Sequence, residues 1–226
     1  MGAKIFVVPT PIGNLKDITI RALEVLQQVD TILAEDSRNT LKLLKHYNIS
    51  PKKILSYHKF NEHASIKVLI DRLQGGESMA LVSDAGTPAI SDPGYLLVRA
   101  CIDNNIEIEV LPGATAFVPA LILSGFPTNS FVFEGFLPHK KGRQKKLKLL
   151  AQENRTIILY ESPYRLIKLL QELRLYFGKD RQMAVMRELT KLYEEVIRGS
   201  VEQIIEYYST RKVKGEIVVI ISPLEN

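Results

Sequence analysis

Residues 78–94 read SMALVSDAGTPAISDPG, and this stretch says most about the fold of the chain. Its first five residues form an apolar run that is typical of a buried strand. The loop over 83–94 is longer than the roughly two to six residues that usually join a strand to a helix. In an open α/β sheet, ligands bind at loops that follow the carboxyl ends of strands. The stretch therefore predicts an α/β fold with a ligand site at one sheet edge.

Strand-like and helix-like segments alternate on both sides of this stretch, which is typical of an α/β protein with largely parallel strands. Asp17 is placed to cap the helix that is expected to begin at Ile18. The predicted strands are 4–9, 31–34, 53–57, 78–82, 107–111, 131–134, 156–160, 183–187, 194–198 and 215–222. The predicted helices are 18–29, 41–46, 65–74, 95–103, 166–177 and 201–208, together with the segment 140–148.

The pattern changes after Gly113, and 226 residues suffice for two small domains. We expect a boundary near Pro112–Gly113, with an N-terminal α/β domain over 1–112 and a C-terminal α/β domain over 113–226. The segments 183–187 and 194–198 are close enough in the chain to pair as a hairpin. This pairing predicts a mixed sheet in the second half.

The composition excludes several classes of protein. Hydrophobic residues make up 46% and charged residues 24%, ordinary values for a folded globular chain. No apolar run approaches the ~20 residues that span a bilayer, and the first residues contain no secretory segment. A single cysteine, Cys101, excludes internal disulfides, and we expect it in the core. His58 and His63 lack a third ligand nearby, so no metal site is expected. We expect a cytoplasmic protein.

The net charge of +5 is concentrated in the basic segment, residues 140–148. The chain outside it is close to neutral. Such a patch is expected of a protein that binds nucleic acid or polyphosphate, and a solvated helix face is the alternative. We expect the six cations to be exposed, so that replacing them leaves the fold intact. They are Lys140, Lys141, Arg143, Lys145, Lys146 and Lys148.

Three further loops contain residues suited to binding. Residues 9–15, PTPIGNL, join a strand to a helix, and they match neither the dinucleotide-binding nor the P-loop glycine pattern. Residues 111–116, LPGATA, have small side chains that permit close approach by a flat ligand such as adenine. Residues 161–165, ESPYR, set an acid and an arginine on either side of a turn.

These loops, in this order, resemble the tetrapyrrole methylase superfamily and, more narrowly, the ribosomal RNA small subunit methyltransferase I family. The similar blocks cover nearly the whole chain, although Ser37 stands where many members have Thr. The sequence ends at Asn226, where many members continue with a small C-terminal segment. The blocks are PTPIGNLKDIT, AEDSR, SDAGTPAISDPG, EVLPGATA, FEGFLPHKKGRQKKL, ILYESPYR, RELTKLYEEVIRG and KGEIVVII.

The resemblance implies two α/β domains of the tetrapyrrole methylase type, with mixed sheets and S-adenosyl-L-methionine (SAM) in the cleft between them. It implies methylation of the ribose 2′-hydroxyl of a cytidine in 16S rRNA, with the small ribosomal subunit as partner, and a homodimer. The implied cofactor contacts are Pro11, Asp84, Thr87, Thr115, Ala116, Tyr160 and Leu189. Glu35 and Asp36 are expected to be structural or to face the substrate.

A ribose hydroxyl is a poor nucleophile, so a positioned base helps to remove its proton. Glu134 is the first candidate for this base, because it precedes the basic segment, and Glu161 and Glu188 are the others. Lys191 is a further candidate for orienting a phosphate. The RNA contacts expected are Lys140, Lys141, Arg143, Lys145, Lys146, Arg165 and Arg187.

Two other functions fit parts of the sequence. A C-methyltransferase that acts on a tetrapyrrole intermediate would share the fold and the cofactor, and its substrates are polyanions as well. The blocks SDAGTPAISDPG and FEGFLPHKKGR resemble the rRNA enzymes and not the porphyrin enzymes. A non-catalytic RNA-binding or ribosome-assembly factor is the third possibility, and retention of every cofactor loop argues against it.

Overall fold

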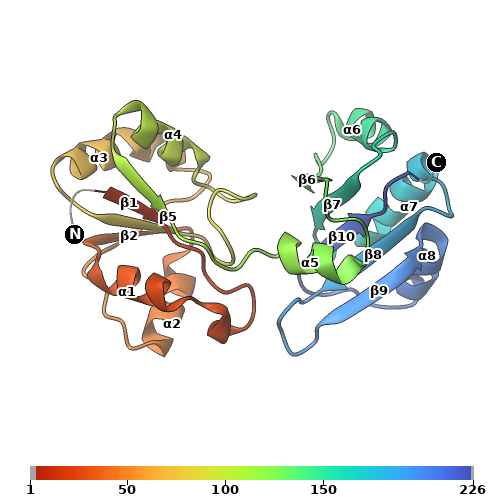
Figure 1. Cartoon of the computed structure of the whole chain (residues 1–226), viewed down its shortest axis with the longest axis horizontal. Coiled ribbons are helices and arrows are strands. Elements are labelled where there is room, and N and C mark those ends of the chain that lie inside the picture. Colours follow the sequence, from red (N-terminus) through yellow and green to blue (C-terminus); the bar gives the residue numbers. More distant parts are fainter. Residues whose placement is uncertain (1–3, 225–226) are drawn as a thin grey trace. The chain divides into compact units, whose positions relative to one another are not determined.

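The computed structural model describes residues 4–224, and the chain divides into two compact units, Met1–Thr115 and Ala116–Asn226. Figure 1 shows both units, each built on its own sheet. The expected boundary at 112–113 falls in the loop that leads from the last strand of the first unit to the first helix of the second. No helix within residues 4–224 has both the length and the apolar character needed to cross a bilayer.

The first unit is a parallel sheet with strand order β3-β2-β4-β1-β5. All four residues of β2 and of β4 are buried, because helices cover both faces of the sheet. The strands are β1 Lys4–Val7, β2 Thr31–Ala34, β3 Ile54–Ser56, β4 Met79–Val82 and β5 Glu107–Val110. The helices are α1 Ile20–Gln28, α2 Ser37–His46, α3 Glu62–Gln74 and α4 Tyr95–Asp103, with a 3-10 turn over Leu15–Asp17.

Helices α1 and α2 pack on one face of this sheet, and α3 and α4 pack on the other (Figure 1). Leu26 of α1 and Leu44 of α2 belong to the first cluster of buried side chains. Leu73 of α3 and Cys101 of α4 belong to the second. The expectation that Cys101 lies in the core is confirmed, and burial raises the pKa of its thiol to about 11.

The starts of the first two helices differ from expectation. Thr19, not Asp17, caps α1, and its side chain accepts a hydrogen bond of 3.0 Å from the backbone N–H of Ala22. Asp17 belongs to the preceding 3-10 turn, so the helix begins two residues later than predicted. Helix α2 begins earlier than predicted, at Ser37, because Asp36 caps it.

The second unit has a mixed sheet with strand order β6-β7-β10-β8-β9. Strands β6 and β7 are parallel, whereas the other neighbours are antiparallel. The predicted hairpin is confirmed as β8 and β9, and so is the mixed sheet. The strands are β6 Phe131–Phe136, β7 Thr156–Glu161, β8 Gln182–Arg187, β9 Glu195–Ser200 and β10 Ile217–Ile221. The helices are α5 Phe117–Ser124, α6 Arg143–Leu150, α7 Leu166–Phe177 and α8 Val201–Ser209.

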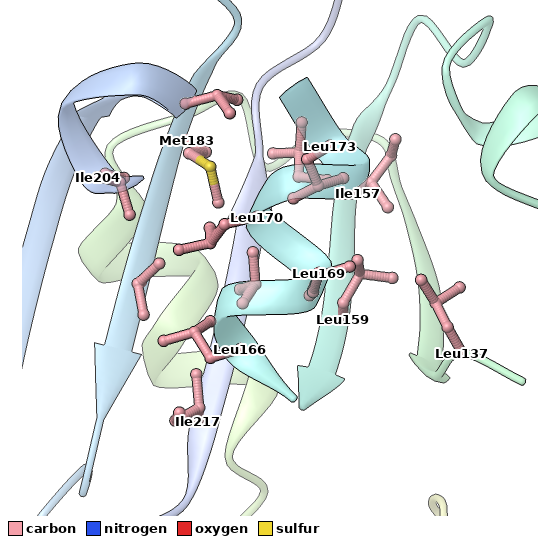
Figure 2. Packing of buried hydrophobic residues seen from close by; sticks show 14 of the residues in the cluster. Leu137, Ile157, Leu159, Leu166, Leu169, Leu170, Leu173, Met183, Ile204 and Ile217 are labelled. Atoms are coloured by element: carbon pink, nitrogen blue, oxygen red, sulfur yellow. The ribbon is translucent and has the colours of Figure 1, made fainter. Parts of the chain in front are cut away.

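The two faces of the second sheet have different coverings. Figure 2 shows Leu166, Leu169 and Leu173 of α7 packed toward Ile157 and Leu159 of β7. Helices α6 and α8 add buried side chains to the same cluster, so we call this side the helix face. Helix α5 lies against β8 and β10 on the opposite side, which we call the α5 face. Because side chains alternate along a strand, Tyr160 points to the α5 face.

Candidate functional site

The loops that follow β1 and β4 in the first unit are joined by backbone hydrogen bonds. The N–H of Thr10 donates to the carbonyl of Gly86 at 2.9 Å, and the N–H of Gly86 donates back at 3.0 Å. The Thr10 hydroxyl also donates to the carbonyl of Ser83 at 3.1 Å. These three hydrogen bonds join the two loops at the carboxyl edge of the sheet.

The loop after β5 joins the same assembly. The hydroxyl of Thr87 donates to the carbonyl of Ala114 at 3.0 Å and lies 2.6 Å from the hydroxyl of Thr115. Gly113 packs on Pro9 so closely that a Cβ at Gly113 would lie 2.6 Å from the Pro9 Cβ. We call residues 9–14, 83–94 and 111–115 the loop cluster. It brings together the predicted cofactor residues Pro11, Asp84, Thr87 and Thr115, as the sequence led us to expect.

Asp84 connects the loop cluster to the end of β2. Its carboxylate accepts hydrogen bonds from the N–H of Asp36 at 3.1 Å and from the side-chain amide of Asn39 at 3.0 Å. A carboxylate has about four acceptor positions, so the exposed Asp84 retains capacity for a ligand donor. Asp36 has a structural role, and hydrogen bonds from Arg38 lower the pKa of its carboxyl to about 2.

Glu35 lies beside Asp84 and has the opposite electrostatic environment. Burial raises the pKa of Glu35, and the negative charges of Asp84 and Asp36 raise it further, against a hydrogen bond from the backbone of Asp84. The carboxyl groups of Glu35, Asp36 and Asp84 thus lie near the C-terminal ends of β2 and β4. Over residues 4–224, no group of three or more His, Cys, Asp or Glu side chains is arranged to hold a metal ion.

The long loop after β4 contains strained backbone. Ala89 has a φ of 68° and Ser91 a φ of 65°, both in the left-handed region that non-glycine residues rarely adopt. Such conformations persist where the surrounding structure enforces them, and they concentrate at ligand sites. The strain therefore supports the interpretation of 83–94 as a binding loop.

In the second unit, Tyr160 is part of an aromatic group on the α5 face. Its ring centroid lies 5.2 Å from that of Phe133 and 5.7 Å from that of Phe136. Phe117 of α5 lies 4.8 Å from Phe133. Sequence reasoning identified Tyr160 and missed the three phenylalanines. The near-alternation of Phe131, Phe133 and Phe136 along β6 was the available signal, because alternate residues share a face.

The structure does not bring Glu134 to this aromatic group. The carboxylate of Glu134 forms an ion pair of 2.8 Å with Lys146 of α6, on the helix face. A bulge between Phe133 and Gly135 interrupts the register at this point. The candidate base and the predicted cofactor contact Tyr160 therefore lie on opposite faces of the sheet.

Arg143 corrects the expectation that all six cations of the basic segment are solvated. It is only 4% exposed and pairs with Glu172 of α7 at 2.6 Å. It also donates to the carbonyl of Pro138 at 3.1 Å. A side chain held in this way anchors α6 to the core and is not presented to RNA. The expectation of exposure holds for Lys140, Lys141, Lys145 and Lys148, whereas Lys146 is partly buried.

Arg165 is held by a second buried acid. Its Nη2 lies 2.7 Å from Oε1 of Glu161, a residue that is 2% exposed at the end of β7. Among the described residues, the other oxygen of Glu161 has no hydrogen-bond partner, and the nearest cation, Arg143, is 3.8 Å away. Glu161 therefore positions the 161–165 turn, since its carboxylate also accepts from the N–H of Ser162 at 2.8 Å.

The loop after β8 holds Leu189 between two strained residues. Glu188 has a φ of 54° and Thr190 a φ of 65°. Glu188 accepts hydrogen bonds from Lys191 at 2.8 Å and from the N–H of Glu216 at 2.9 Å. Burial alone would raise the pKa of Glu188, but these bonds outweigh it and lower the pKa. Glu188 is therefore an ionised group held by hydrogen bonds, which makes it a poor candidate for a base.

Arg187 ends β8 and pairs with Glu195 of β9 at 3.2 Å. The hydroxyls of Tyr207 and Tyr208 each donate to Glu195 at 3.0 Å. Burial opposes the charge on Glu195, yet these three donors together lower its pKa. Arg187 and Glu195 line a pocket of about 450 Å³ within the second unit. Its other lining residues are Glu188, Tyr193, Tyr208, Arg211, Lys212, Val213, Lys214 and Gly215.

Comparison with known proteins agrees with this arrangement of strands and loops. The family model described as Tetrapyrrole (Corrin/Porphyrin) Methylases matches residues 4–205. The ribosomal RNA small subunit methyltransferase I of Synechocystis sp. is 52% identical over 96% of this chain and 78% of that protein. Its counterpart in Thermotoga maritima is 47% identical over 98% of this chain and 99% of that protein.

Solved structures share the fold at much lower identity. The methyltransferase CobJ superposes with a TM-score of 0.73 at 17% identity, over 97% of this chain and 94% of that one. A uroporphyrin-III C-methyltransferase from Thermus thermophilus, solved in complex with S-adenosylhomocysteine, gives 0.66 at 16% identity over 96% of each chain. The chain therefore belongs to the tetrapyrrole methylase family of methyltransferases and, within it, to the group of ribosomal RNA small subunit methyltransferase I proteins.

Proposed function

We propose that this enzyme transfers a methyl group from SAM to the ribose 2′-hydroxyl of a cytidine in 16S rRNA of the small ribosomal subunit. The observation that supports this most is the loop cluster of the first unit. Three separate loops are joined there into one preorganised surface. The chain that carries this surface is about half identical to relatives named as rRNA methyltransferases.

The residues present suit SAM chemically. Asp84 offers carboxylate oxygens to an ammonium or a ribose hydroxyl, and the short side chains at 113–116 leave room for a flat base. The aromatic group around Tyr160 offers an apolar face. The proposed contacts are Pro11, Asp84, Thr87 and Thr115 in the first unit, with Ala116, Tyr160 and Leu189 in the second.

SAM, when bound, supplies the methyl group on a sulfonium, which is transferred by in-line displacement. The task of the protein is to align the acceptor oxygen and to exclude water. The backbone pairing of Thr10 with Gly86 and the hydroxyl contact of Thr87 with Thr115 hold the binding loops in one arrangement before the cofactor arrives. This rigidity reduces the entropy that binding would otherwise consume.

Proton removal from the acceptor is the step that Glu134 was expected to assist. If Glu134 is the base, Glu134→Gln lowers kcat by about 10²–10⁴-fold with little change in KM. If its role is the ion pair with Lys146, kcat stays at the wild-type value. Lys146→Gln is the matched control, because it removes the same ion pair and leaves the carboxylate in place.

The RNA contacts we propose lie in the second unit. Lys140, Lys141 and Lys145 are exposed, and no ion pair involves them among residues 4–224. Lys146, Arg165 and Arg187 are each paired with an acid, so RNA would have to compete with that acid or share the cation. Arg143 is withdrawn from the set, because its side chain is buried against Glu172.

The test measures methyl transfer from labelled SAM to 16S rRNA and to assembled small subunits, with mass spectrometry of the ribose-methylated nucleotides. We expect one modified cytidine, and no transfer when that nucleotide carries a 2′-deoxyribose. Transfer to the deoxy substrate at the normal rate would contradict the ribose assignment. Transfer to a tetrapyrrole and not to RNA would replace the proposed function with the C-methyltransferase alternative.

The remaining expectations concern location and assembly. We place the enzyme in the cytoplasm, because its proposed substrate is the ribosomal subunit, and we propose that it acts as a homodimer, as the family resemblance implies. Light scattering of the purified protein at micromolar concentration tests the second point. A mass near 25.5 kDa, that of one chain, would contradict it.

A further inference from the structure

The pocket at the end of the β8–β9 hairpin is built from segments far apart in the sequence. Arg187 and Glu195 come from the two strands of the hairpin, and residues 211–215 form the segment between α8 and β10. The pocket has a volume of about 450 Å³, enough for a sugar phosphate rather than a single ion. All of its lining residues belong to the second unit.

The charges in this pocket do not cancel. Of the two acids in the lining, Glu195 pairs with Arg187, and Glu188 pairs with Lys191, which lies outside the lining and also pairs with Glu216. The remaining cations of the lining are Arg211, Lys212 and Lys214, all of them exposed. Within residues 4–224, no ion pair between these three side chains and an acid is formed. The lining therefore holds four cations and two acids, a surplus of two positive charges.

The walls of the pocket are firmly held. The guanidinium of Arg211 lies 4.1 Å from the centre of the Tyr207 ring, a cation–π contact that restrains this side chain. The φ of Gly215 is +89°, and any Cβ there would overlap the carboxylate group of Glu188. The segment 211–215 is thus fitted to the strained Glu188–Thr190 loop, on which the proposed cofactor contact Leu189 lies.

We propose that this pocket holds a phosphodiester group of the RNA substrate close to the nucleotide that is methylated. The proposal rests on the proposed function. Guanidinium and ammonium groups bind phosphate oxygens through charge-assisted hydrogen bonds, and a planar guanidinium does so with two donors at once. A surplus of two positive charges exceeds what one cofactor carboxylate requires, so the methionine end of SAM does not account for it. The pocket adjoins the loop of Leu189, a proposed cofactor contact, and for this reason we assign the phosphate to the neighbourhood of the methylated nucleotide.

The first experiment compares the salt dependence of RNA binding by the wild-type enzyme, a pocket variant and a control variant. The pocket variant is Arg211→Gln, Lys212→Gln, Lys214→Gln, and the ligand is a single-stranded 16S rRNA fragment that the wild-type enzyme methylates. Each phosphate contact contributes about 0.7 to the slope of log K against log salt, so losing the one phosphodiester held in the pocket should flatten the slope by about 0.7. The control removes the same charge from exposed lysines of the first unit, Lys45, Lys59 and Lys67. We expect the control to keep the wild-type slope.

The second experiment locates the phosphate. A series of the same RNA fragment carries one uncharged methylphosphonate linkage at successive positions. We expect one linkage near the target cytidine to weaken wild-type binding about tenfold, the worth of one charge-assisted hydrogen bond, and to leave the pocket variant unaffected. Equal losses for both proteins at every linkage would overturn the proposal, as would a pocket variant whose salt slope matches the wild type.

These outcomes are separable from failure of the proposed function. If the wild-type enzyme methylates the fragment but the pocket variant binds it with an unchanged salt slope, only the pocket assignment is wrong. If the wild-type enzyme methylates no RNA, the proposed function fails, and the pocket assignment fails with it. SAM affinity, measured by calorimetry, should be the same in all three proteins, because the pocket cations are not among the proposed cofactor contacts.

Discussion

The buried Arg143 and the partly buried Glu172 form an ion pair in which two guanidinium nitrogens contact one carboxylate oxygen, Nη2 at 2.6 Å and Nε at 2.9 Å. The pair fixes α6 to α7. Removing one partner from a buried pair typically destabilises a protein by about 3–5 kcal/mol, because the other charge stays buried without compensation. We therefore expect this loss for Arg143→Gln in urea unfolding. Lys145→Gln, an exposed change on the same helix, should alter stability by less than ~0.5 kcal/mol.

The exposed lysines of the basic segment should bind RNA without affecting the fold. Replacing four of them by glutamine removes up to four phosphate contacts, so the log–log salt slope of RNA binding should flatten by about two to three. The unfolding midpoint should not move. The variant changes Lys140, Lys141, Lys145 and Lys148, and its control changes Lys45, Lys53, Lys59 and Lys67. Equal slopes for the two variants would show that the basic segment is only a solvated face.

Gly113→Ala should separate two loops of the loop cluster. The added Cβ would lie 2.6 Å from the Pro9 Cβ, a distance at which one loop must move. Overpacking of this kind costs about 1–3 kcal/mol, and here the displaced loop is a proposed cofactor loop. We expect weaker SAM binding by calorimetry as well as lower stability. The control is Gly76→Ala. Gly76 lies between α3 and β4 with a φ of +100°, so alanine there should lower the stability of the protein and leave its SAM affinity unchanged.

Glu35→Gln should stabilise the enzyme at neutral pH. The pKa of Glu35 is raised in the folded state, mainly by burial, so the folded protein binds this proton more tightly than the unfolded chain. Wild-type stability therefore falls as pH rises above the ordinary value of 4.5. Glutamine retains an acceptor for the N–H of Asp84 and has no charge to bury.

Urea unfolding at several pH values checks this prediction. The stabilisation by Glu35→Gln should be present at pH 7 and absent at pH 3, where the wild-type carboxyl is protonated in both states. Glu24→Gln, an exposed change on α1, is the control. A stabilisation that persists unchanged at pH 3 would mean that the effect of the Glu35→Gln substitution is not electrostatic.

The elements that the sequence predicted well are those with strong local patterns. Helix 95–103 and helix 166–177 have the predicted bounds, and the β8–β9 hairpin follows from two strand-like segments close together in the chain. The gathering of loops at one sheet edge was also predictable, because parallel strands place their carboxyl ends together. The start of the first helix was not predictable in this way, because Asp17 is a favoured capping residue but lies in a 3-10 turn, and Thr19 caps the helix instead.

The burial of Arg143 could have been predicted from the spacing of residues in α6, although the charge count alone did not indicate it. Arg143, Leu147 and Leu150 are spaced by four and three residues, which puts them on one helix face, and all three are buried. Reading the segment as a run of cations concealed that stripe. The pocket at Arg187 had no comparable signal, since residues 187 and 211–215 meet only through the order β10-β8-β9.

The position of β1 in the first sheet also has a consequence for synthesis of the chain. Strand β1 is made before the other strands of its unit, and within residues 4–224 its partners are β4 and β5, the last two strands of that unit to be made. At roughly 5–20 residues per second, β4 follows β1 by roughly 4–15 seconds. During that interval the backbone N–H and C=O groups along the edges of β1 have no native partner, and the loop 9–14 lacks the hydrogen bonds that join Thr10 to Gly86. The first unit thus assembles its loop cluster, the proposed binding surface, only when its last strand has been made.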